Sequence, residues 1–227
     1  MQKKVYLCTI FEKKYTMPIY IFDLGGVLIN LHVSRCMAVF EALMGEANMR
    51  AVLGMDSRGE GVKAVSVASK QLMYEFERGL ISEENFVKEI LPFCHPGTTP
   101  QQVIDAWMAM LADLPAERLA FIDELRAKGY KTYMLSNGND LHFHFIDQTY
   151  GLRPRFNALF LSQEMHIAKP EPEIFKAVHA AIQPAADEQV IFIDDLELNR
   201  LAAERTVHWK TFSSIDELKA AGDIESR

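Results

Sequence analysis

The sequence is short of cysteine. Its 227 residues include only Cys8, Cys36 and Cys94, which lie far apart and match no Cys-x-x-Cys or Cys/His metal spacing. This scarcity excludes a disulfide framework and the usual zinc-binding patterns. Reduced, structural thiols are expected, as in proteins of the reducing cytosol, so we predict a cytoplasmic location.

Basic residues are also too few for binding nucleic acid. The chain has 24 Lys and Arg against 31 Asp and Glu, a formal net charge of −7, and no basic stripe that could neutralise a phosphate backbone. A small phosphorylated molecule stays possible as a partner, because a few local donors and a metal ion are enough to bind one phosphate.

Long apolar runs are absent as well. No stretch approaches the roughly 20 residues of a membrane-spanning helix, so no membrane partner is expected. The short apolar run near the start is broken by Glu12, Lys13 and Lys14 and has no small-residue cleavage site, which excludes a signal peptide. Because Met17 directly precedes a strand-like run, we interpret residues 1–16 as an N-terminal extension.

What the sequence does contain is an alternation of short apolar runs with amphipathic helical patterns. Its 49% apolar and 24% charged residues are typical of a globular protein, and its length suffices for a core domain and a smaller companion. The runs that predict strands are 19–23, 130–135, 157–161, 189–194 and 207–212. Strands alternating with helices indicate βαβ units, so we predict an α/β fold with a doubly wound parallel sheet.

One interval departs from this alternation. More than a hundred residues separate the first two predicted strands, although a βαβ unit needs only about 30. The surplus has helical patterns at 34–45, 62–78, 82–91 and from Thr99-Pro100 onward. We predict a helical cap domain over 34–110, inserted into a core made of 17–33 and 111–227. Since such sheets bind ligands at the carboxyl ends of their strands, the cap is expected to be a lid there.

Polar residues follow three of the predicted strands. They are Asp23 after the first strand, Ser136 and Asn137 after the second, and Asp194 and Asp195 after the fourth. Lys169 stands in a loop just before another helix, and a parallel sheet gathers all these positions at one edge. Taken singly, each has a structural alternative: a helix N-cap for Asp23, a turn for Ser136-Asn137, an exposed side chain for Lys169. Their order on successive strands is the specific signal.

The chemistry of this cluster is that of phosphoryl transfer. Two adjacent acids after a buried strand repel each other unless a cation compensates, and carboxylates on neighbouring strands suit Mg²⁺. Ser136 and Asn137 offer hydroxyl and backbone N–H donors to an anion, and Lys169 offers a positive charge. Phosphoryl transfer depends on such positioning and charge neutralisation, and the Asp23 carboxylate is a candidate nucleophile.

In this order the motifs resemble those of the haloacid dehalogenase superfamily. The stretches FDLGGVL, LSNG, AKPEPEIF and FIDDLELN are similar to its first to fourth motifs, and the inserted helices are similar to the cap of its subfamily I. The resemblance implies a Rossmann-like core and a Mg²⁺-dependent phosphatase for a small phosphorylated metabolite, a sugar phosphate among the possibilities. It implies Asp23 as the nucleophile, which forms an aspartyl-phosphate, and Lys169 as its catalytic partner.

The resemblance also assigns binding roles. The phosphate would be held by Leu24, Ser136, Asn137 and Lys169. The Mg²⁺ site would be formed by Asp23, Asp195 and the backbone carbonyl of Gly25, with Asp194 supporting it from beside or behind.

The sequence departs from the family at Gly25. Most phosphatases of the superfamily have a second Asp there, as a general acid and base worth about 10²–10⁴-fold. Three alternatives stay open: a slower phosphatase using water or another acid such as His32, a metal-independent 2-haloacid dehalogenase, or a catalytically weak phosphate-binding or regulatory protein. The pair Asp194-Asp195 favours Mg²⁺ and phosphate over the dehalogenase. The two glycines suit the tight turn that follows the strand, and position 25 can keep its carbonyl role with any side chain.

Other conspicuous residues are interpreted as structural. His142 and His144 alternate with aromatic residues on a predicted helix, where positions two apart do not share a face, so they are not a metal pair. Trp107, Tyr74 and Phe76 are expected to pack inside the cap.

Overall fold

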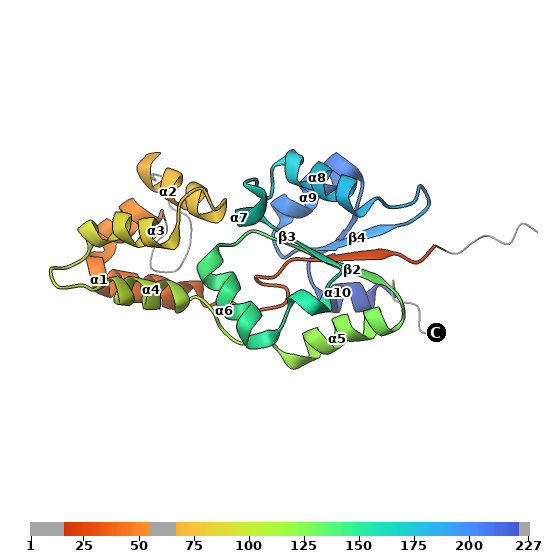
Figure 1. Ribbon diagram of the computed structural model, residues 1–227, viewed down its shortest axis with the longest axis horizontal. Helices are drawn as coiled ribbons and strands as arrows, with labels where there is room; N and C mark the ends of the chain where they lie inside the picture. The colour runs from red at the N-terminus through yellow and green to blue at the C-terminus, as the bar shows by residue number, and fades with distance from the viewer. Residues whose placement is uncertain (1–15, 55–66, 223–227) are drawn as a thin grey trace, which may run out of the picture.

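The computed structural model describes residues 16–54 and 67–222, which contain a five-stranded parallel sheet of order β3-β2-β1-β4-β5 (Figure 1). Its strands are β1 (Ile19–Phe22), β2 (Lys131–Ser136), β3 (Ala158–Leu161), β4 (Val190–Ile193) and β5 (Lys210–Phe212). Each strand falls on a run that predicted one, and the doubly wound α/β fold is confirmed. Of the predicted N-terminal extension, residues 1–15 lie outside the described residues.

The register of the central strands brings their carboxyl ends to one edge. Phe22, the last residue of β1, lies opposite Met134 of β2 and Ile193 of β4. The residues that follow Phe22 and Ile193 therefore emerge side by side, with Ser136 at the end of β2 next to them. Both β1 and β4 are buried along their whole length, as expected for parallel strands that are covered on both faces.

Helices cover both faces of the sheet (Figure 1). One face is covered by α5 (Ala116–Ala127), α6 (Asp140–Tyr150) and α10 (Ile215–Ala220), the other by α8 (Pro172–Ile182) and α9 (Glu197–Val207). The alternation of side chains along β1 explains the two layers. Tyr20 and Phe22 pack into the first apolar cluster, and Ile19 and Ile21 into the second.

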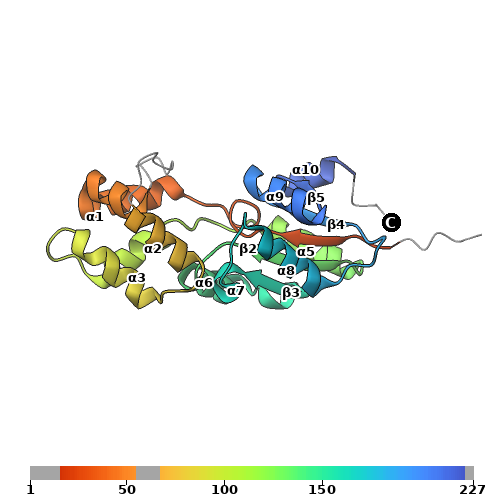
Figure 2. The ribbon, with the colours of Figure 1, turned by 90° about the horizontal axis from the view of Figure 1, so that it is seen from above.

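The helical insertion lies beyond the carboxyl ends of the strands (Figures 1 and 2). It comprises α1 (Val33–Leu53), α2 (Val67–Glu77), α3 (Glu83–Ile90) and α4 (Pro100–Met108). These helices share an apolar cluster of their own, in which the rings of Phe76 and Phe86 stack 3.8 Å apart. Helix α4 begins with the capping box of Thr99 and Gln102, which satisfies backbone N–H groups that a helix start leaves open.

The insertion differs from the prediction at two points. Helix α1 continues past residue 45 to Leu53, with a break at Gly45, whose φ of 76° a glycine adopts without strain. The prediction for Tyr74 is wrong: its side chain is exposed, and its ring lies 3.7 Å from the guanidinium of Arg78. Of the predicted helix 62–78, residues 62–66 lie outside the described residues.

The two connections between core and insertion run side by side. Leu31 and Leu111 form an antiparallel bridge, and the backbone N–H of Asn30 donates to the carbonyl of Asp113 at 2.9 Å. The predicted boundaries at 33 and 111 fall within or next to this paired segment. In the described part of the chain, no helix combines the length and apolarity needed to cross a membrane.

Candidate active site

The predicted polar residues meet around one buried lysine. The Nζ atom of Lys169 lies 3.0 Å from Asp23 Oδ2 and 2.6 Å from Asp194 Oδ2, and it donates to the carbonyl oxygen of Leu135 at 3.0 Å. The side chains of Lys169 and Asp194 are almost completely buried. The alternative of an exposed lysine is therefore wrong, because carboxylates from two neighbouring strands hold the ammonium group inside the protein.

Asp23 combines burial with close contact to a cation. Its backbone N–H donates to the carbonyl of Ile193 at 2.9 Å, and its Oδ1 accepts from the N–H of Leu24 at 2.6 Å. Burial raises the pKa of Asp23 to about 7, opposed by the charge of Lys169 and reinforced by that of Asp194. Burial alone would lower the pKa of Lys169, but the two carboxylates outweigh burial and raise it. Lys169 therefore stays charged and favours the ionised form of Asp23.

Asp194 is fully engaged in hydrogen bonds. Its Oδ2 binds Lys169, and its Oδ1 accepts from the N–H of Leu196 at 2.9 Å and from Nδ2 of Asn199 at 3.0 Å. Asp194 thus fixes the position of Lys169 from behind. The role of Asn199 was missed in the sequence, although it lies within the FIDDLELN stretch, near the start of α9.

Three carboxylates gather at this edge. Asp23, Asp194 and Asp195 bring oxygen atoms within 4.8 Å of one another, and the positive charges beside them are the buried Lys169 and Arg200, whose guanidinium donates to the carbonyls of Asp194 and Asp195. Burial, and then the charge of Asp194, raise the pKa of Asp195, the direction expected where negative charge is not compensated. Hard oxygen donors with excess negative charge suit Mg²⁺, so the residues present fit the metal that the sequence predicts.

The two glycines after β1 have different reasons to be there. Gly26 has a φ of 74°, and a Cβ on it would lie 2.4 Å from Asp195 Oδ2, so only glycine fits against that carboxylate. Gly25 has no such backbone requirement. A Cβ there would lie 3.0 Å from Leu31 Cδ1, the end of a partly exposed side chain. The turn therefore requires glycine at position 26 but not at position 25, and Leu31 occupies the space beside Gly25.

Ser136 is the last residue of β2 and Asn137 follows it, and the Asn137 side chain has a positioning role. Its Nδ2 donates to the carbonyl of Lys169 at 2.8 Å, and its Oδ1 accepts from the Lys169 N–H at 2.9 Å. This pair of bonds fixes the loop that carries the lysine. The hydroxyl of Ser136 donates to the carbonyl of Asn137 at 3.2 Å.

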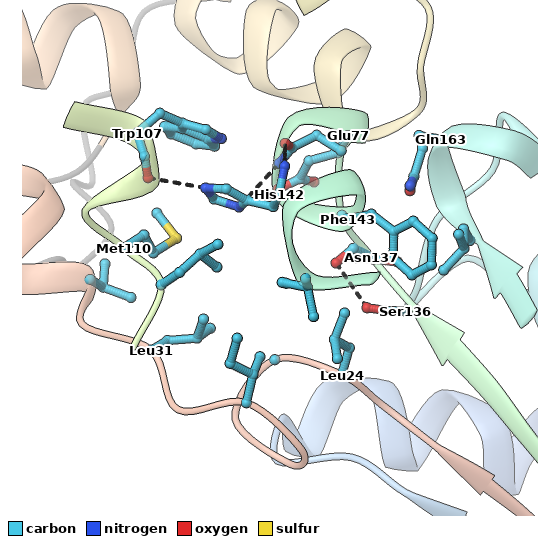
Figure 3. A pocket seen from close by; sticks show the side chains of 18 of the residues that line it. Leu24, Leu31, Glu77, Trp107, Met110, Ser136, Asn137, His142, Phe143 and Gln163 are labelled. Carbon is cyan, nitrogen blue, oxygen red and sulfur yellow. Dashed lines mark hydrogen bonds between the residues drawn. The ribbon is translucent and has the colours of Figure 1, made fainter. Parts of the chain in front are cut away.

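A cavity of about 220 Å³ lies between this edge of the sheet and the insertion (Figure 3). The core contributes Leu24, Gly25, Ser136 and Asn137 to its lining, and the insertion contributes Met73, Glu77 and Trp107. His32 is exposed and is not among the lining residues, which weakens its case as a substitute acid.

His142 also lines the cavity. The two histidines of α6 do lie on different faces: His144 is exposed, whereas His142 is buried and stacks on Trp107 at 5.3 Å. The Nε2–H of His142 donates to the carbonyl of Trp107 at 3.0 Å. Burial lowers the pKa of His142 to about 4, so the ring is neutral near pH 7 and joins α6 to α4.

The chain matches the model of one known protein family over most of its length. The model of haloacid dehalogenase-like hydrolases matches residues 17–205. The chain belongs to the haloacid dehalogenase-like hydrolase family. This confirms the resemblance that the motifs indicated, and with it the conclusion that the protein is a hydrolase.

Relatives of this hydrolase include a phosphatase and an enzyme crystallised with magnesium and phosphate. It is similar to a D-ribitol-5-phosphate phosphatase of Bacteroides thetaiotaomicron, with 25% identity over 183 residues that cover 77% of this chain and 81% of that protein. A family enzyme from the same organism, solved as an aspartate-to-alanine variant with magnesium and inorganic phosphate, aligns with a TM-score of 0.73 and 30% identity, over 87% of this chain and 93% of the other.

Two further structures extend the comparison. A family hydrolase from Porphyromonas gingivalis aligns with a TM-score of 0.74 and 26% identity, over 93% of this chain and 100% of the other. The L-2-haloacid dehalogenase of Xanthobacter autotrophicus aligns with a TM-score of 0.54 and only 18% identity, over 86% of this chain and 76% of the other. The latter similarity shows a common fold and nothing more.

Proposed function

We propose that this hydrolase is a Mg²⁺-dependent phosphatase that acts on a small phosphorylated metabolite through an aspartyl-phosphate at Asp23. The observation that carries the proposal is the grouping of three carboxylates at the edge of the sheet, two of which hold the buried, charged Lys169. The magnesium complex and the phosphatase among its relatives support the same interpretation.

Each residue then has a defined task. An oxygen of Asp23 attacks phosphorus, the ester P–O bond breaks, and the alcohol leaves with a proton taken from water. Water next attacks the phosphorus of the aspartyl-phosphate, which releases inorganic phosphate and restores the carboxylate. Lys169 favours the ionised form of Asp23 and offsets the charge of the phosphoryl oxygens. Ser136 and the backbone N–H groups of Leu24 and Asn137 orient the phosphate.

The metal would be held by the side chains of Asp23 and Asp195 and by the carbonyl of Gly25, with Asp194 behind them. When bound, Mg²⁺ supplies positive charge to the phosphoryl oxygens and to the attacking carboxylate. Gly26 supports this arrangement, because its missing Cβ lets the loop lie against Asp195.

We further propose that residues 34–110 are a cap whose hinges lie near 32–34 and 110–115, where the two connections to the core are paired. The cavity has walls from both the core and the insertion, so closure would remove the substrate from water. A lid of this kind favours transfer of the phosphoryl group over side reactions.

The proposed function is tested with a panel of phosphorylated sugars, alditols and nucleotides, assayed with Mg²⁺ and with EDTA. We expect phosphate release from at least one sugar or alditol phosphate, and its loss when EDTA removes the metal. A 2-haloacid belongs in the same panel as the alternative substrate. Release of halide at equal rates with and without EDTA, with no release of phosphate, would overturn the proposal.

The absence of an acid at position 25 predicts a slow second step. Substrates with good leaving groups, such as acyl phosphates, should show a burst of product followed by slow turnover, because water attacks the aspartyl-phosphate without a base. Gly25→Asp should raise the steady rate by up to about 10²-fold, and Leu31→Ala can be combined with it to clear the space that Leu31 occupies. Rapid quench separates the two phases.

Gly25→Asn is the matched control, since it has the same size but cannot transfer the proton. Equal steady rates for the Asp and Asn variants would argue against a missing base. Burst-free kinetics with good and poor leaving groups alike would show that another residue already supplies the proton transfer.

A further inference from the structure

Buried polar groups without partners line the cavity. Within the described part of the chain, both side-chain amide atoms of Gln163 and the indole Nε1 of Trp107 are buried and make no hydrogen bond. The two residues are only 5% and 4% exposed, and both line the cavity. Buried donors and acceptors are nearly always paired, so a ligand that fills the cavity is the natural source of partners.

These groups are held in place by the contact between core and insertion. The hydroxyl of Ser162 donates to the carbonyl of Glu77 at 2.5 Å and accepts from the N–H of Gly138 at 3.0 Å. Next to it, the carbonyl of Gln163 lies against Gly79, where a Cβ would approach to 2.3 Å. The backbone of Gln163 is thus fixed between the two parts of the protein, and its side chain is presented at the cavity wall.

Trp107 is also held in one position. Its indole ring stacks on His142 and packs against Phe86 with centroids 5.1 Å apart, while its carbonyl accepts the bond from His142. In Figure 3 the labelled side chains of Trp107, Glu77 and Gln163 lie on the side of the cavity opposite Leu24 and Ser136. A phosphate bound near Ser136 would therefore direct the rest of the substrate toward them.

The types of hydrogen-bonding group identify what they would bind. Trp107 Nε1 can only donate, Gln163 Oε1 can only accept, and Gln163 Nε2 can only donate. A cation would leave the donors unpaired, and an anion would meet the carboxyl group of Glu77 in the same wall. A hydroxyl both donates and accepts, so a chain or ring with several hydroxyls satisfies all three atoms. Met73, Met110 and Phe143 line the cavity as well and suit the carbon skeleton of such a molecule.

We propose that Gln163 and Trp107 determine the specificity of this hydrolase by binding hydroxyl groups of the substrate's leaving group. The inference rests on the proposed phosphatase function and deepens it, because it selects polyhydroxylated phosphate esters over alkyl phosphates. A site built to bind hydroxyls rejects an analogue without them, since its buried polar atoms would then stay unpaired.

The test compares a pentitol phosphate with pentyl phosphate, which has the same chain length and no hydroxyl. The variants are Gln163→Met, which keeps the side-chain size, and Trp107→Phe, which keeps an aromatic ring beside His142 and removes the indole N–H. Each is expected to lower the ratio of kcat/KM for the two esters, pentitol over pentyl, by at least about 10-fold. The exposed Gln101→Met on α4 is the matched control and should leave the ratio unchanged.

Calorimetric titration of the same two esters into the Asp23→Asn variant, with and without Gln163→Met, separates binding from turnover. A fall in affinity for the pentitol phosphate alone supports the inference even if the wild-type protein releases no phosphate, a result that would sink only the proposed function. Two results would overturn the inference. One is equal affinity of the Asp23→Asn protein with intact Gln163 for both esters. The other is a kcat/KM ratio that neither Gln163→Met nor Trp107→Phe changes.

Discussion

Asp23→Asn is expected to lower phosphate release by more than about 10³-fold while the fold persists. A carboxamide is a poor nucleophile and carries no charge for Lys169 or a metal, yet it has nearly the size of the carboxylate. The variant therefore loses the first chemical step without creating a cavity. Steady-state phosphate release measures the loss, and mass spectrometry of acid-quenched protein detects the aspartyl-phosphate in the wild type and its absence in the variant.

The control for this experiment is Asp216→Asn, a substitution of an exposed aspartate in the first turn of α10. Turnover by this variant should match that of the wild type. Circular dichroism and a thermal scan establish that both variants are folded. Turnover close to that of the wild type in Asp23→Asn would rule out covalent catalysis by this residue.

Lys169→Met is expected to have the second large effect, on stability as well as on turnover. Its ammonium group is buried between Asp23 and Asp194, so its removal leaves two buried carboxylates without their cation. Breaking a buried ion pair in this way costs about 3–5 kcal/mol of unfolding free energy. Urea denaturation of metal-free protein measures the loss, and phosphate release should fall together with it.

The destabilisation should depend on pH in a definite direction. Burial already raises the pKa of Asp23. Without the charge of Lys169 this pKa rises further above its value in the unfolded chain, so the folded state binds more protons. Stability then falls as the pH rises, and the deficit of Lys169→Met relative to the wild type should be larger at about pH 8 than at about pH 5.

Lys131→Met provides the matched lysine control. Its ion pair with Glu188, at 3.1 Å, lies at the surface, with the lysine side chain 48% exposed. Exposed pairs contribute between about 0 and 1 kcal/mol, so this variant should lose little stability and keep its turnover. If Lys169→Met lost as little stability as Lys131→Met, and lost it equally at every pH, the charge of Lys169 would not be what stabilises the buried cluster.

The sequence by itself determined the strands, the parallel arrangement of the sheet and the identity of the residues at its carboxyl edge. These features are local: an apolar run of four or five residues, a polar residue where the run stops, and a helical pattern afterwards. The parallel arrangement then fixes where the strand ends meet, which is enough to place Asp23, Ser136 and Asp194 together. The long helical stretch between the first two strands was equally visible, because a βαβ unit has no room for it.

Only the tertiary structure decided what the residues around that edge do. Lys169 of the AKP stretch lies in a loop and is buried because two carboxylates surround it. These carboxylates, Asp23 and Asp194, follow two different strands. The requirement for glycine at position 26 could not be recognised in the sequence, since its reason is Asp195, far along the chain. The same holds for Asn137, whose amide binds the backbone of Lys169.

The residues that form the cavity wall could not be predicted from the sequence, because contacts between segments far apart in the chain bring them together. Ser162 binds the carbonyl of Glu77 across 85 positions, and His142 binds that of Trp107 across 35. Periodicity tells which face of a helix is apolar, but not which element that face will meet or which polar group remains unpaired afterwards. In the sequence, Trp107 therefore indicates only packing inside the cap, and Gln163 belongs to no pattern that singles it out. Their importance arises when the insertion and the core close around the same space.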